Sequence, residues 1–121
     1  MAKTITHDIF LLLKLKLQKH KTLPVRIVTG SMLPLIKIDE NIWVEPAPPL
    51  EELKRFDILV YWSDDKFICH YLDRINDVIN SDQKVLILKG LKNKGQDFPV
   101  YYENLFGKVN MKIPWYLRLW R

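Results

Sequence analysis

The chain has 121 residues, a length that suits one domain and leaves no room for a second large core. Hydrophobic residues make up 48% and charged residues 27%, a balance that excludes a disordered chain. The single cysteine, Cys69, excludes an internal disulfide framework and a cysteine-rich zinc site. The net charge of +5 belongs to the N-terminus, because residues 1–26 hold six basic residues and one acidic residue while the rest of the chain is balanced.

The first segment, residues 4–21, is predicted to be an amphipathic helix that Thr6 or Asp8 could cap. Leucines and lysines that alternate over residues 11–17 keep a strand open as the alternative. At helical spacing, one stripe of the segment is polar and consists of Lys3, His7, Lys14, Gln18 and Lys21. The remaining face is apolar and carries Ile5, Ile9, Leu12 and Leu13.

The longest apolar run, residues 9–13, is too short to cross a bilayer, which takes about 20 residues. Lys14 and Lys16 stand where a signal peptide would carry its cleavage region. We therefore expect a cytoplasmic protein with neither a transmembrane helix nor a signal peptide. Residues 1–21 and 113–121 both mix apolar side chains with cations, which is typical of peripheral contact with a membrane surface. Packing of these segments against the core is the alternative.

After Pro24, short runs of β-branched and apolar residues alternate with turn signals. Residues 63–66 are predicted to form a hairpin turn, residues 90–104 a long polar loop, and Gly107 a bulge or a close backbone contact. Strands are expected at 25–29, 41–45, 57–62, 67–72, 85–88 and 105–113. Regular spacing without intervening helices predicts a mostly β, antiparallel fold, either a coiled sheet or a partly open barrel.

Three polar residues stand out against this background. Ser31 follows Gly30 at the end of a strand, where a serine can present its hydroxyl and its own backbone N–H to one point. His70 lies in an otherwise apolar strand, and Asp97 lies in the polar loop. Taken singly, each has an ordinary explanation: a serine turn, a core histidine and a solvated acid.

Their order and context resemble a known superfamily, that of the signal peptidases and the self-cleaving repressors. The ordered motifs are Thr29-Gly30-Ser31-Met32-Leu33-Pro34, Phe56-Asp57-Ile58-Leu59-Val60-Tyr61, His70-Tyr71, Lys89-Gly90 with Asp97 eight residues after Lys89, and Phe106-Gly107-Lys108-Val109. The resemblance covers about residues 25–113 and is closest to the archaeal and endoplasmic-reticulum type of signal peptidase, which uses a histidine base. It implies a β fold of the LexA–signal peptidase type.

The resemblance also implies an activity, that of a serine endopeptidase that cuts after a small residue and needs no cofactor or metal. Ser31 would be the nucleophile, His70 the general base and Asp97 its support, with Thr29 and the Ser31 N–H holding the oxyanion. A peptide or protein substrate would bind as an extended strand. Val28, Met32 and Pro34 would contact it.

The chain departs from the family pattern at several positions. Leu91 replaces an acid, Tyr71 replaces an arginine, and Ile38 and Phe56 replace glycines. These changes favour the alternative of a catalytically inactive member that binds a peptide or a protein. A lysine base in place of histidine would have to come from a distant residue, with Lys66 nearest in sequence.

The expected organisation is a basic segment at 1–24, a catalytic β domain at 25–113 and an aromatic, basic tail at 114–121. A nucleic-acid partner is not expected, because about 24 residues before the domain are too few for a three-helix DNA reader. The sequence leaves the oligomeric state open.

Overall fold

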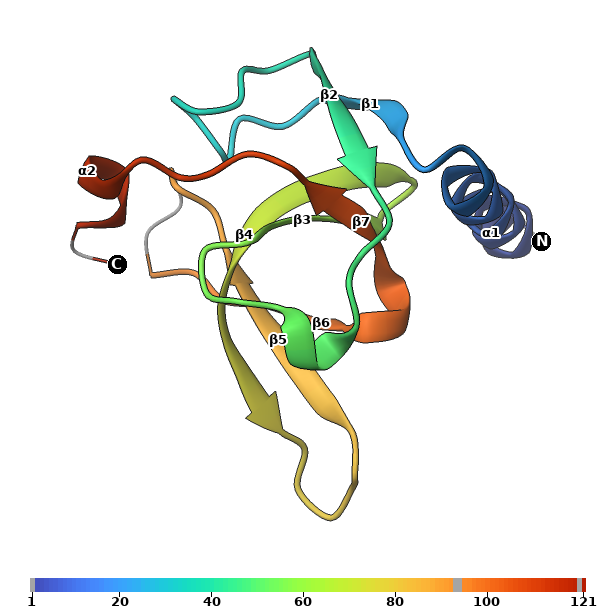
Figure 1. Ribbon diagram of the computed structural model, residues 1–121. Helices are drawn as coiled ribbons and strands as arrows, with labels where there is room; N and C mark the ends of the chain where they lie inside the picture. The colour runs from blue at the N-terminus through green and yellow to red at the C-terminus, as the bar shows by residue number, and fades with distance from the viewer. Residues whose placement is uncertain (1, 93–94, 120) are drawn as a thin grey trace.

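The computed structural model describes residues 2–92, 95–119 and 121, with side chains described from residue 7 onward. Asn93 and Lys94 of the predicted loop and Trp120 of the predicted tail lie outside these residues. The fold is mostly β, as predicted: one antiparallel sheet of seven strands that does not close, in the order β1-β2-β7-β3-β4-β5-β6 (Figure 1). Its elements are α1 Ala2–His20, β1 Leu23–Ile27, β2 Glu40–Glu45, η1 Leu50–Glu52, β3 Ile58–Ser63, β4 Lys66–Asp77, β5 Lys84–Lys89, β6 Phe98–Tyr101, η2 Tyr102–Asn104, β7 Leu105–Val109 and α2 Trp115–Arg118.

The central strand β3 is buried on both of its faces. Ile58 and Val60 join a core cluster with α1, β1 and β2, whereas Leu59 and Tyr61 join a second cluster with β5 and β6. Because successive side chains of a strand point to opposite faces, one apolar run feeds both clusters. The sheet curls around this strand, which also brings β1 against β4.

The hairpin between β3 and β4 forms at the predicted turn. Asp64 and Asp65 both have positive φ, 51° and 63°, the conformation of the tight turns whose twist matches a hairpin. The hairpin fixes the register in which Leu59 lies opposite His70 and Tyr61 opposite Ile68. Because residues opposite one another and two apart share a face, Tyr61 and His70 lie on the same side of the sheet.

Two loop and strand predictions need correction. Residues 98–101, placed in a long loop, form the edge strand β6, and the last strand ends at Val109 instead of residue 113. Gly107 fulfils its prediction: a Cβ there would clash with the Glu45 carbonyl oxygen, so the close approach of β2 to β7 requires glycine. The register of β3 against β7 also shifts beside it.

The N-terminal segment is a helix, as predicted, but the face that packs on the core is only partly the expected one: Leu13 contacts the core, and most of the polar stripe stays exposed. Phe10 and Leu17 are buried in the core, whereas Ile9 and Leu12 of the expected apolar face are exposed. Neither Thr6 nor Asp8 caps the helix, because it begins at Ala2. Within the described residues, no helix has the length and apolar character needed to cross a bilayer.

Candidate functional site

Ser31 and His70 line one pocket, although β2 and β3 separate them in the chain. The pocket has a volume of about 330 Å³ and opens between the segment after β1 and the β3–β4 hairpin. Its lining residues are Thr29, Ser31, Tyr61, Ser63, Asp64, Lys66, Ile68, His70 and Phe98. The structure thus brings together the predicted nucleophile, the predicted base and Thr29.

Ser31 begins a tight turn directly after β1. The Ile36 N–H donates to the Met32 carbonyl at 3.0 Å, and the Lys92 N–H donates to the Ser31 carbonyl at 2.9 Å. The Ser31 hydroxyl donates to the Cys69 carbonyl at 3.3 Å and lies 3.4 Å from the Thr29 hydroxyl. In the described part of the chain, no backbone carbonyl accepts the Ser31 N–H, which leaves that donor available.

Gly90 lies between Ser31 and His70. A Cβ on Gly90 would lie 2.8 Å from the Ser31 carbonyl oxygen, 3.1 Å from Ser31 Cβ and 3.4 Å from His70 Cδ2. One point beside Gly90 is therefore close to both side chains, and the absence of a Cβ is what lets them approach. The two do not yet form a hydrogen bond, since the Ser31 hydroxyl is turned to the Cys69 carbonyl.

The His70 ring is held from two sides. It stacks on Phe98 with ring centroids 4.3 Å apart, and its Nδ1 lies 3.1 Å from the Tyr61 hydroxyl. Burial lowers the pKa of His70 to about 4 and raises the pKa of Tyr61 to about 12. At neutral pH both groups are therefore uncharged, and the imidazole is free of a proton at one ring nitrogen.

Asp97, expected to support His70, is instead bonded to cations. Its carboxylate lies 3.0 Å from the Arg74 guanidinium and 3.6 Å from the Lys89 ammonium. The Arg74 hydrogen bond lowers the pKa of Asp97. Asp97 directly precedes Phe98, and neighbouring side chains of an extended segment point to opposite faces. Because Phe98 faces His70, Asp97 faces away from it. The hydroxyl of Tyr61, instead of the Asp97 carboxylate, contacts Nδ1 of the ring.

The expected substrate contacts do not line this pocket. Met32 is buried in the core, with 1% of its surface exposed. Val28 and Pro34 are exposed outside the pocket. The turn that begins at Ser31 explains the positions of Met32 and Pro34, because it carries residue 32 inward and residue 34 outward.

Tyr61 and Phe98 contact His70 but are not among the predicted site residues. Tyr61 belongs to a predicted apolar strand and Phe98 to the predicted polar loop, and only the hairpin register and strand β6 place them on His70. Lys66, considered as a substitute base, also lines the pocket but is exposed at its rim. Cys69 is fully buried, and burial raises the pKa of its thiol, so it is no nucleophile at neutral pH.

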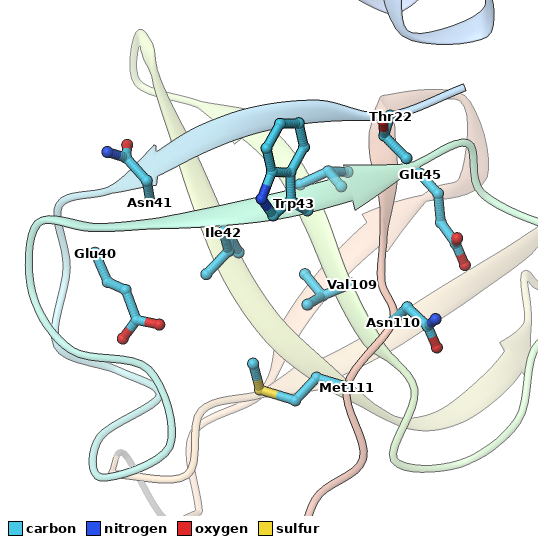
Figure 2. A pocket seen from close by; sticks show the side chains of 10 residues that line it. Thr22, Glu40, Asn41, Ile42, Trp43, Glu45, Val109, Asn110 and Met111 are labelled. Atoms are coloured by element: carbon cyan, nitrogen blue, oxygen red, sulfur yellow. The ribbon is translucent and has the colours of Figure 1, made fainter. Parts of the chain in front are cut away.

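A groove of about 450 Å³ lies elsewhere, between β2 and the segment that follows β7 (Figure 2). Ile42, Val109 and Met111 form its apolar part, and Glu40 and Glu45 lie at its sides. Its lining contains no serine, cysteine or histidine. The pocket with Ser31 and His70 is therefore the better candidate for chemistry.

The buried His70 predicts a loss of stability in acid. Its folded-state pKa of about 4 lies below the ordinary value of 6.5, so the unfolded state binds the proton first. Stability should fall as the pH drops below 6.5, by about 2 kcal/mol at pH 5 from this group, and level off below pH 4. Urea unfolding at a series of pH values measures this. The His70→Phe variant should lack this component, and an equal acid loss in the variant would contradict the assignment.

Comparison with protein-family models, with curated proteins and with solved structures finds no match to this chain.

Proposed function

We propose that the protein is a serine endopeptidase that uses Ser31 as nucleophile and His70 as general base. The observation that supports it best is the shared pocket, in which both side chains border the space beside Gly90. An imidazole that is unprotonated at neutral pH can accept the serine proton, and its lowered pKa makes it a weaker base than one that titrates near pH 7. The ordered resemblance to the signal peptidase superfamily is the second ground for the proposal.

In the proposed reaction, the Ser31 side chain first turns from the Cys69 carbonyl toward the His70 ring. The hydroxyl oxygen attacks the substrate carbonyl carbon, and its proton passes to His70 Nε2. The Ser31 N–H and the Thr29 hydroxyl stabilise the oxyanion. His70 then returns the proton to the leaving amine as the C–N bond breaks, and water hydrolyses the acyl-enzyme by the same route.

Tyr61 takes the place that an acid holds in most such sites. For Nε2 to accept a proton, the neutral ring must carry its hydrogen on Nδ1. The Nδ1–H group then donates a hydrogen bond to the Tyr61 hydroxyl oxygen, 3.1 Å away. A hydroxyl orients the ring but does not supply the negative charge that a carboxylate gives an imidazolium. We therefore expect slower turnover than in enzymes that have the carboxylate.

The substrate in this proposal is an extended peptide. The pocket begins where β1 ends, and β1 is an edge strand whose outer side has no partner among the described strands. A peptide laid along such an edge gains backbone hydrogen bonds and presents its scissile bond to Ser31. The resemblance favours a small residue before that bond.

The alternative is a binding module without turnover. Two observations favour it: the Ser31 hydroxyl is not bonded to His70, and Asp97 is paired with Arg74. Such a protein would hold an extended peptide along the same edge of the sheet and release it intact.

A mixture of unstructured peptides distinguishes the two functions. We expect new amino termini to accumulate with time, with small residues enriched before the cleaved bond, as mass spectrometry would record. A fluorophosphonate should also phosphonylate the Ser31 oxygen, with fluoride as the leaving group, and leave Ser63 in the same pocket unmodified. Peptides retained on the immobilised protein without new termini would support the binding module instead.

A further inference from the structure

The outward side of α1 exposes four large apolar residues among charged ones, which include Asp8, Lys16 and Lys19. Leu12 and Leu15 are 65% and 64% exposed, and Ile9 and Leu11 are nearly half exposed. Phe10 and Leu17 already attach the helix to the core from its other side. Leucines exposed to this degree in one group are unusual on a soluble surface and mark a place where something binds.

Cations accompany this face in a regular way. Lys16 and Lys19 are exposed and follow Leu12 and Leu15 by one helical turn each. The segment as a whole is the basic part of the chain, since residues 1–26 hold six basic residues against Asp8, and the other residues are balanced. The lysines therefore lie on the same face as the leucines, and their long side chains can reach anionic headgroups while the leucines contact the apolar layer below.

We propose that α1 docks the protein on an anionic membrane surface, with the side that carries Leu12 and Leu15 turned into the lipid and Ile9 and Leu11 at its two margins. The helix lies in the plane of the interface, its leucines among the acyl chains and its lysines at the headgroup phosphates. This role is independent of catalysis, because the face contains no residue of the pocket with Ser31 and His70.

The C-terminal residues 113–121, which also mix aromatic residues with cations, fit a lipid surface less well. Trp115 and Tyr116 are exposed at α2, which lies at the opposite end of the molecule from α1 in the view of Figure 1. The arginines there are already engaged, since Arg118 donates to the Ile113 carbonyl at 2.7 Å and Arg121 to the Leu91 carbonyl at 2.6 Å. Arginines held by backbone carbonyls are less available to phosphates.

A second copy of the chain is the competing occupant of the α1 face. Charge disfavours it, because two such helices packed face to face would bring Lys16 and Lys19 of both copies together. Anionic lipid instead gives these lysines a partner of opposite sign.

Vesicle flotation of the whole protein tests the proposal. Vesicles of phosphatidylcholine with phosphatidylglycerol should carry the protein upward at low salt, whereas vesicles of phosphatidylcholine alone should carry much less. The double variant Leu12→Gln/Leu15→Gln should bind the anionic vesicles about tenfold less, because it removes the apolar contact and leaves the charge. The double variant Lys16→Glu/Lys19→Glu should bind the anionic vesicles less than the wild type does at low salt. This difference should shrink as salt is added, because salt screens the attraction between the lysines and the lipid.

The matched control is Ile79→Gln, which changes an even more exposed apolar residue in the β4–β5 loop, 88% exposed, and should float like the wild type. Wild-type protein that stays unbound to anionic vesicles at low salt would overturn the proposal. So would a Leu12→Gln/Leu15→Gln variant that binds as well as the wild type. Sedimentation without lipid completes the test, since a dimer that these same substitutions dissociate would assign the face to a second copy.

Discussion

Ser31→Ala is expected to abolish peptide cleavage while leaving the fold intact. Loss of the attacking oxygen removes the covalent route, and in serine peptidases the loss of a triad member lowers kcat by about 10⁴- to 10⁶-fold. The structural effect should be small. The hydroxyl makes only two long contacts, 3.3 Å to the Cys69 carbonyl and 3.4 Å to Thr29, so we expect a stability change below about 1 kcal/mol.

The matched control is Ser63→Ala, which removes a second serine hydroxyl from the same pocket. It should keep cleavage within a few-fold of the wild type. Both variants are compared by the rate at which new peptide termini form and by thermal unfolding. Cleavage that survives in the Ser31 variant, with the wild-type melting temperature, would remove Ser31 from the mechanism and leave the peptidase proposal without a nucleophile.

Alternation and turn chemistry predicted most of the sheet. Strands β2, β3 and β5 lie within a residue or two of their predicted bounds, because each is a compact apolar run flanked by turn residues. Strand β6 escaped prediction because it has four residues and contains Pro99. A proline in a strand is tolerated at a sheet edge, and β6 is an edge strand, so only the tertiary arrangement reveals it.

The partner of His70 could not be predicted for a related reason. Motif order selects residues by their place in the chain, and Asp97 has the expected offset from Lys89. Strand register decides toward which face of the sheet a side chain points. Here it places Phe98 against the His70 ring and Asp97 beside Arg74. Tyr61 is selected only once β3 and β4 are aligned, because its relation to His70 runs diagonally across the hairpin.

The orientation of α1 shows the limit of periodicity. Helical spacing identified an apolar set with Ile9 and Leu12, yet the core accepts Phe10 and Leu17. When a helix has apolar residues around most of its circumference, periodicity alone does not decide which of them face the sheet. The larger ring of Phe10 contacts Trp62 and Phe106, with ring centroids 6.2 and 6.3 Å away.

Gly90→Ala should damage both stability and the proposed activity. The added Cβ would lie 2.8 Å from the Ser31 carbonyl oxygen, a distance that side chains do not tolerate, and that oxygen belongs to the backbone. The β5 end or the Ser31 turn must therefore move, which disturbs the bond from the Lys92 N–H to the Ser31 carbonyl. We expect a loss of about 1–3 kcal/mol in the free energy of unfolding.

The same displacement should separate Ser31 from His70, because the Cβ would enter the space that both side chains border. A misplacement of about 1 Å in such a pair costs about 100-fold in rate, so cleavage should fall by that order while much of the fold survives. Urea unfolding and the rate of peptide cleavage measure the two effects separately.

Gly30→Ala is the matched control. Its Cβ would meet Leu33 Cδ1 at 3.0 Å and Ile38 Cδ1 at 3.2 Å, and both are ends of flexible side chains that can turn aside. This variant, although adjacent to Ser31, should keep most of its stability and cleavage. Equal effects of the two substitutions would show that Gly90 has no special place between nucleophile and base. A Gly90 variant with wild-type cleavage would mean that Ser31 and His70 do not need this close approach to react.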